Sequence, residues 1–221
     1  MKGNSRRGQK RKRKVNNRPL GFPRLLIVTE GTKTETNYFN SIKERIQERF
    51  KENIIVDKID LEVKGIGRGT MGVVEQALKS RNRHTYSQVW VLIDKDNFTD
   101  FDQAIKKAED EGLNVGWSNQ SFELWYLLHF QEVSGRMENE TIINRLSIHL
   151  RQHGITHNQY SKSDPLSYDD LKVTINDAIA RSKRIMEMHQ NYGNKTPSVM
   201  NPATTVYKLI EDLLPYLNKD E

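Results

Sequence analysis

The feature that most constrains the fold of this chain is an apolar run at residues 88–93 (QVWVLI), which ends directly in Asp94-Lys95-Asp96. Its β-branched and aromatic side chains, uninterrupted by glycine or proline, indicate a short buried strand. A second run, at residues 24–29 (RLLIVT), ends at Glu30-Gly31, where the glycine favours a turn. The sequence therefore predicts two buried strands, each followed at once by a carboxylate.

Amphipathic helices are predicted between the strands and after them. Tyr38, Ile42, Ile46 and Phe50 recur every four residues, which is the spacing of one helix face. Helices are predicted at residues 34–51, 71–81 and 101–111, and further strands at residues 59–66 and 113–117. Beyond residue 121 the pattern predicts helices alone, at residues 122–130, 140–152, 169–190 and 204–217. The predicted fold class is α/β, with a mostly parallel sheet flanked by helices and a helical C-terminal region.

A parallel sheet would bring the two strand-ending carboxylates together. Ligands of such sheets gather at the carboxyl edge of the strands, and Glu30 and Asp94 both follow a strand directly. If the second strand continues through Asp96, the side chains of Asp94 and Asp96 point to the same face. Carboxylate oxygens suit Mg²⁺, and Glu30 could complete the site or act as a general acid or base. The alternative is that these acids merely cap their strands.

Four segments resemble a known family. They are residues 25–39 (LLIVTEGTKTETNYF), 89–97 (VWVLIDKDN), 118–130 (SNQSFELWYLLHF) and 201–209 (NPATTVYKL). Together they resemble the RloB-like family, which is found in bacterial restriction and phage-defence loci and is related to Toprim domains. The resemblance implies a Toprim-like fold in which Glu30 matches the catalytic glutamate, and Asp94 with Asp96 match the D-x-D metal ligands.

The resemblance extends to residues that would bind a second metal ion. Ser121-Phe122-Glu123 is similar to the S-x-E element of OLD-family Toprim nucleases, which helps to bind a second metal, and Lys162 is the candidate for a downstream catalytic lysine. Glu35 lies one residue away from the spacing of a further acid in that family, so it is not assigned as a ligand. A structural alternative for Glu123 is that a glutamate in the first turn of a helix complements the helix dipole.

The resemblance also implies a function. It predicts a Mg²⁺-dependent nuclease, with Mn²⁺ as an alternative metal, that cuts DNA or RNA (tRNA included) in bacterial defence against phage. RloB-like proteins are often encoded beside an ATPase, which makes an ATPase a candidate partner. A homo-oligomer is also possible. The competing prediction is a non-catalytic nucleic-acid-binding or scaffold subunit of such a defence complex.

Charge is distributed unevenly along the chain. Residues 1–24 hold ten Lys and Arg and no acid, whereas 25 basic residues face 29 acidic ones in the remainder. Residues 1–21 are predicted to be a disordered basic arm, followed by an α/β domain at 22–130 and a helical region packed on it at 131–221. The arm could contact a phosphate backbone or simply aid solubility. Its candidate nucleic-acid contacts are Arg6, Arg7, Lys10, Arg11, Lys12, Arg13 and Lys14.

Composition excludes several other classes. The chain has no cysteine, which excludes disulfides and thiolate chemistry. It has no apolar run long enough to cross a membrane and no signal core, so a cytoplasmic protein without membrane contact is expected.

Two other motifs offer alternative sites. A G-x-G-x-x-G motif at residues 67–72, with Asp94 22 residues further on, is a candidate dinucleotide site. That interpretation leaves Glu30 and Asp96 without a role; within a nuclease, Arg68 of this turn could contact phosphate. His149 and His153, four residues apart, could suggest zinc, but an exposed helix face explains them better.

Overall fold

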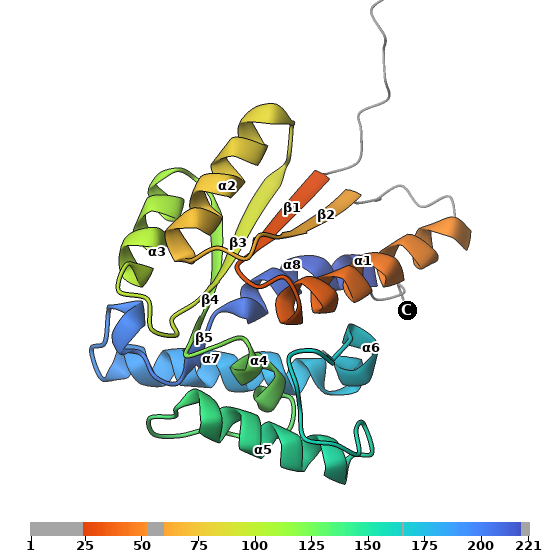
Figure 1. Ribbon diagram of the computed structural model, residues 1–221, viewed down its shortest axis with the longest axis vertical. Coiled ribbons are helices and arrows are strands. Elements are labelled where there is room, and N and C mark those ends of the chain that lie inside the picture. Colours follow the sequence, from red (N-terminus) through yellow and green to blue (C-terminus); the bar gives the residue numbers. More distant parts are fainter. Residues whose placement is uncertain (1–23, 53–59, 165, 218–221) are drawn as a thin grey trace, which may run out of the picture.

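The computed structural model describes residues 24–52, 60–164 and 166–217. The described strands form one five-stranded sheet in the order β2-β1-β3-β4-β5 (Figure 1). They are β1 (Arg24–Thr29), β2 (Asp60–Gly65), β3 (Gln88–Asp94), β4 (Asn114–Asn119) and β5 (Ala203–Thr204). β1 to β4 run parallel, and β5 pairs antiparallel with β4. The α/β class and the mostly parallel sheet predicted from the sequence are confirmed.

Helices cover both faces of this sheet (Figure 1). α2 (Thr70–Arg83) and α3 (Phe101–Asp110) contact each other on one face, and α1 (Thr34–Glu52) and α8 (Val206–Leu217) contact each other on the opposite face. Because the central strands are covered on both sides, residues 25–29 of β1 are all buried. None of the described helices is both long and apolar enough to span a membrane.

The remaining helices lie together in the lower part of Figure 1. They are α4 (Glu123–Leu128), α5 (Asn139–Gln152), α6 (Tyr168–Leu171) and α7 (Ile175–Asn191). α4 contacts both α5 and α7, so it is the centre of this group. The helical C-terminal region is thus present, while its division from the α/β part at residue 130 stays a prediction.

Two details of this region differ from the sequence prediction. The helix expected at 169–190 is interrupted by a 3-10 turn at Lys172–Thr174. The prediction of helix alone beyond residue 121 is wrong at Ala203–Thr204, which form β5. Thr204 pairs with Ser118, and their hydroxyls lie 3.0 Å apart. A two-residue strand carries no periodicity of its own, and its partner lies 86 positions earlier in the chain.

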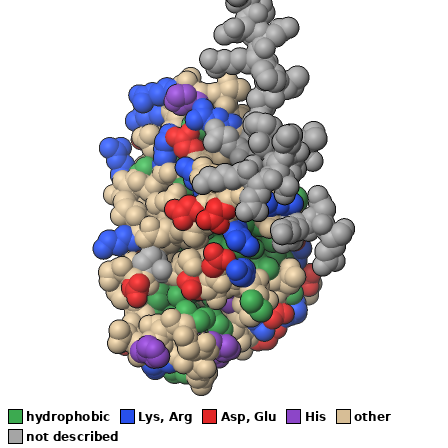
Figure 2. Space-filling model, turned by 90° about the vertical axis from the view of Figure 1, so that its right-hand side faces the viewer, with side chains coloured by type: hydrophobic (Ala, Val, Ile, Leu, Met, Phe, Trp, Pro, Cys, Tyr) green, Lys and Arg blue, Asp and Glu red, His purple; other side chains and the backbone are tan. Residues whose placement is uncertain are grey.

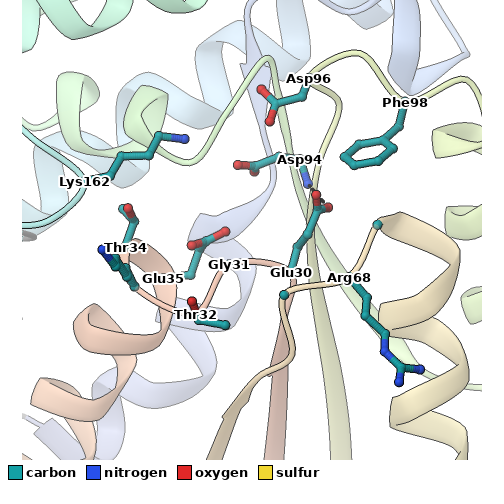
Figure 3. A pocket seen from close by; sticks show the side chains of 13 residues that line it. Glu30, Gly31, Thr32, Thr34, Glu35, Arg68, Asp94, Asp96, Phe98 and Lys162 are labelled. Atoms are coloured by element: carbon teal, nitrogen blue, oxygen red, sulfur yellow. Dashed lines mark hydrogen bonds between the residues drawn. The ribbon is translucent and has the colours of Figure 1, made fainter.

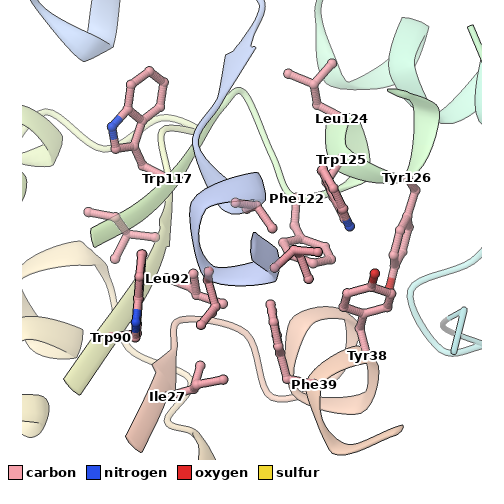
Figure 4. Packing of buried hydrophobic residues seen from close by; sticks show 14 of the residues in the cluster. Ile27, Tyr38, Phe39, Trp90, Leu92, Trp117, Phe122, Leu124, Trp125 and Tyr126 are labelled. Atoms are coloured by element: carbon pink, nitrogen blue, oxygen red, sulfur yellow. The ribbon is translucent and has the colours of Figure 1, made fainter. Parts of the chain in front are cut away.

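An aromatic cluster joins the sheet to the C-terminal helices (Figure 4). Tyr38 and Phe39 of α1 meet Phe122 and Tyr126 of the α4 segment, edge to face, with ring centroids 5.2 to 6.1 Å apart. All four side chains are at most 1 % exposed. The core therefore fixes α4, and the residues just before it, against the end of α1 that follows Glu30.

Candidate active site

The ends of β1 and β3 place two carboxylates at one edge of the sheet. Thr29 of β1 is aligned with Leu92 of β3, and the Glu30 backbone N–H donates to the Leu92 carbonyl at 3.1 Å. The Asp94 backbone N–H lies 3.5 Å from Oε2 of Glu30. Figure 3 shows both side chains directed into one cavity. The parallel sheet therefore brings together Glu30 and Asp94, which are 64 residues apart in sequence.

Asp96 reaches the same cavity by a different route from the one predicted. The strand ends at Asp94, so the argument from alternating side chains along a strand is wrong for Asp96. Asp96 adopts a positive φ of 31° in the turn that follows, and its N–H donates to the Gln120 carbonyl at 3.0 Å. Its Oδ1 accepts a hydrogen bond from the Asn139 side chain at 2.7 Å. Turn geometry and the first residue of α5 thus orient this carboxylate.

The cavity has a volume of about 380 Å³ and lies between the first turn of α1, the turn before α2 and the β3–α3 loop (Figure 3). Its charged lining residues are Glu30, Lys33, Glu35, Arg68, Asp94, Asp96 and Lys162. Glu35, which sequence comparison left unassigned, is only 6 % exposed. A Cβ on Gly31 would overlap the Glu35 carboxylate, so any larger residue at position 31 would require the Glu35 side chain to move. The sequence signal for Glu35 is its place in the first turn of a helix that starts at the strand edge.

The Ser121-Phe122-Glu123 segment lies directly against Asp94. The Phe122 backbone N–H donates to Oδ2 of Asp94 at 2.9 Å. Glu123 is fully buried, and its Oε1 accepts a hydrogen bond from the Tyr160 hydroxyl at 3.2 Å. Oε2 of Glu123 and the Ser121 hydroxyl are buried and have no hydrogen-bond partner among the described residues. Because a buried polar atom without a partner is costly, these two oxygens indicate a place for a ligand.

The loop between α5 and α6, of which residues 153–164 and 166–167 are described, brings two further side chains to the site. Lys162 extends from this loop, and its Nζ lies 3.6 Å from Oε1 of Glu123. Tyr160 comes from the same loop and was not identified from the sequence, because an irregular loop has no periodicity that would indicate where its side chains point. Burial and the nearby Glu123 carboxylate raise the pKa of the Tyr160 phenol above its usual range, so the phenol keeps its proton.

Burial and mutual repulsion govern the charge of these acids. Burial raises the pKa of Asp94 well above its usual range, and the carboxylates of Glu35, Glu123 and Asp96 raise it further. Burial likewise raises the pKa of Glu30 to about 7, with further contributions from other carboxylates, including those of Asp96 and Glu35. Burial tends to lower the pKa of Lys162, but the surrounding acids outweigh it and raise the value. The site therefore concentrates negative charge that its neighbours do not fully compensate.

These residues fit a hard divalent cation. The buried groups facing each other are oxygen donors, which are the ligands that Mg²⁺ and Mn²⁺ prefer, and two of those oxygens have no partner among the described residues. Glu30, Asp94, Asp96, Ser121 and Glu123 are the residues that would hold such an ion. Within the described part of the chain, no three His, Asp or Glu side chains already form a compact ligand cluster.

The raised acid pKa values predict how the stability of the metal-free protein depends on pH. Glu30 has a pKa of about 7 when folded against 4.5 unfolded, so the folded state binds more protons between these values. The protonated Glu30 side chain therefore makes its full contribution to the free energy of unfolding below pH 4.5. This contribution is lost as the pH rises through 7 and Glu30 ionises. In EDTA, we expect the stability advantage of Glu30→Gln over wild type to increase between pH 5 and pH 8. The increase should be about 1 kcal/mol in the free energy of unfolding, or about 3 °C in melting temperature. Thermal unfolding at several pH values measures this, and parallel curves for the two proteins would contradict it.

The other predicted site residues lie further from the acids. Arg68 lines the cavity but is exposed, and its side chain points away from the carboxylates (Figure 3). In the same turn Gly67 has a φ of +59°, and a Cβ on Gly69 would lie 2.8 Å from the Phe98 ring. Backbone geometry and packing thus account for these glycines without a dinucleotide. The seven arm residues from Arg6 to Lys14 lie outside the described residues.

Three of the histidines, His129, His149 and His153, are engaged in packing. The His149 ring stacks on Phe130 with centroids 5.6 Å apart, and His153 lies 5.0 Å from the same ring. His149 also pairs with the Gln131 side chain at 2.8 Å. Burial lowers the pKa of His129 to about 3, and its Nδ1 lies 3.0 Å from the Thr174 hydroxyl. These contacts favour a structural role for all three rings.

The fold and this edge of the sheet define a class: an α/β protein with an acidic cavity at the carboxyl ends of its parallel strands. A family model described as "RloB-like protein" matches residues 25–213, and the chain belongs to this family. The match covers all the cavity residues and confirms the resemblance to the RloB-like family. A search of curated proteins found no match.

Proposed function

We propose that this protein is a Mg²⁺-dependent nuclease of the Toprim type that hydrolyses phosphodiester bonds of DNA or RNA, with Mn²⁺ as an alternative metal. The observation that carries the proposal is the convergence of Glu30, Asp94 and Glu123 from three separate segments, together with the buried unpartnered oxygens of Ser121 and Glu123. A buried group of repelling carboxylates lowers stability, and proteins retain such groups where function requires them.

The residues divide the chemical work between them. The residues that would hold the cation are Glu30, Asp94, Asp96, Ser121 and Glu123. When bound, the cation would neutralise charge at the phosphodiester and lower the pKa of an attacking water. In the metal-free protein the pKa of Glu30 is about 7, so Glu30 is the carboxyl group of this set that could instead act as a general acid or base near neutral pH. Lys162, beside Glu123, supplies positive charge for the phosphate that is being cleaved.

The charge distribution supports a nucleic-acid substrate bound partly through the arm. Among the described residues that are visible in Figure 2, acidic and basic side chains are interspersed. The basic excess of the sequence lies in residues 1–24. Contacts from this segment, together with Arg68 at the cavity, would attract phosphates without reading sequence. By family membership we further propose a cytoplasmic role in antiviral defence, with an ATPase as partner.

A cleavage assay tests the proposed function. The full-length protein is incubated with supercoiled plasmid, linear DNA and total tRNA, each with Mg²⁺, Mn²⁺ or EDTA. We expect cleavage of at least one substrate in either metal and none in EDTA, because the acids cannot neutralise the phosphate themselves. Tight binding to nucleic acid with no cleavage in either metal would instead support the non-catalytic scaffold.

A further inference from the structure

Tyr160 contacts the acid cluster through one hydroxyl group. Its O–H donates to Oε1 of Glu123 at 3.2 Å, and Tyr160 is only 7 % exposed. We propose that Tyr160 is a positioning residue, which fixes the rotation of the Glu123 carboxylate so that Oε2 stays available to a divalent cation. This inference rests on the metal site of the proposed function and adds a residue that lies outside its ligand set.

The two oxygens of Glu123 have different surroundings. Oε1 accepts from Tyr160 and lies 3.6 Å from the Lys162 ammonium, whereas Oε2 is buried and has no partner among the described residues. Without a fixed donor on one oxygen, the carboxylate can rotate about its last torsion and exchange the two. Outer hydrogen bonds that orient a ligating carboxylate commonly change metal affinity by about 10- to 100-fold. The Tyr160 hydroxyl has the position that this role requires.

The backbone of Tyr160 is held independently of Glu123. Its N–H donates to the Ser147 hydroxyl of α5 at 3.0 Å, and that hydroxyl donates to the Ile143 carbonyl at 2.7 Å. Nearer to α6, the Tyr126 hydroxyl of α4 donates to the Leu166 carbonyl at 3.2 Å. The Tyr126 and Tyr160 rings meet edge to face with centroids 6.2 Å apart. Two helices of the C-terminal region thus fix the donor, and the site extends beyond the sheet edge.

Direct metal binding tests the role of Tyr160 without requiring cleavage. Mn²⁺ is titrated into the full-length protein, and its affinity is measured by calorimetry and by electron paramagnetic resonance. For Tyr160→Phe, which removes only the hydroxyl, we expect Mn²⁺ affinity to fall about 10-fold. Tyr38→Phe is the matched control, because Tyr38 is a fully buried tyrosine that, like Tyr160, packs edge to face on Tyr126, and its hydroxyl bonds to none of the carboxylates. Its Mn²⁺ affinity should stay within about twofold of wild type.

The possible outcomes separate this inference from the proposed function. If wild type and Tyr160→Phe bind Mn²⁺ equally, Tyr160 is not a positioning residue, while the metal site itself stands. If wild type binds no Mn²⁺, both ideas fail. If both tyrosine variants lose affinity equally, the effect is one of packing, and the inference is overturned. Ser147→Ala serves if Tyr160→Phe does not fold: losing the acceptor of the Tyr160 N–H should weaken Mn²⁺ binding in the same direction, and unchanged affinity would count against the role.

Discussion

Replacing Asp94 with asparagine is expected to lower Mg²⁺-dependent cleavage by about 10³-fold, because it removes a charge on which cation binding depends. The fold should survive, since the asparagine carbonyl can still accept the hydrogen bond that the Phe122 N–H donates at 2.9 Å. In EDTA the variant should melt at a higher temperature than wild type. Burial and three neighbouring carboxylates raise the pKa of Asp94, so its ionised form opposes folding near neutral pH.

A matched control separates this effect from a general loss of charge. Asp110 of α3 lies outside the cavity lining and pairs with Lys106 at 2.8 Å, with both side chains more than 60 % exposed. Asp110→Asn should leave cleavage and melting temperature nearly unchanged, because exposed pairs contribute little. Steady-state cleavage assays and thermal melts of both variants provide the measurements. Substantial cleavage by Asp94→Asn, at a tenth of the wild-type rate or more, would remove Asp94 from the mechanism.

The strand-end acids were the part of the site that sequence alone could predict. Glu30 and Asp94 each follow a buried apolar run, and in a parallel sheet that local pattern also fixes which edge they share. Asp96 was predicted for the wrong reason, because the strand stops two residues before it and a turn places its side chain. Local periodicity therefore locates a carboxylate only as far as the regular element continues.

Local sequence patterns did not predict the site residues that come from the C-terminal region. Glu123 and Lys162 were found by family resemblance, and their 3.6 Å approach depends on how the α5–α6 loop folds back on α4. Tyr160 and Asn139 were not found at all. Their positions follow from long-range contacts such as that of Tyr160 with Ser147, which leave no repeating pattern in the sequence. The two-residue strand β5 was missed for the same physical reason.

Phe122 connects the hydrophobic core to the acidic cavity, and truncating it should separate stability from chemistry. Its ring is 1 % exposed and lies 5.2 Å from Tyr126 and 5.8 Å from Tyr38. Phe122→Ala should lower the free energy of unfolding by about 3–5 kcal/mol, through lost burial and the cavity left behind. For a chain of this length that corresponds to a fall in melting temperature of about 10 °C.

Cleavage should respond differently, because the Phe122 atom that touches Asp94 is the backbone N–H, which alanine retains. Well below its melting transition, Phe122→Ala should therefore cleave within about tenfold of wild type, in contrast to the loss of about 10³-fold expected for Asp94→Asn. Val173→Ala, at a side chain that is 91 % exposed, is the control and should shift stability by less than about 0.5 kcal/mol. Chemical denaturation and cleavage assays at low temperature measure the two effects.

A Phe122→Ala protein that is as stable as wild type would contradict the packing described for α4. If the Phe122→Ala protein stays folded yet loses cleavage completely, the aromatic ring itself must orient Asp94. Core packing would then contribute to cleavage as well as to stability.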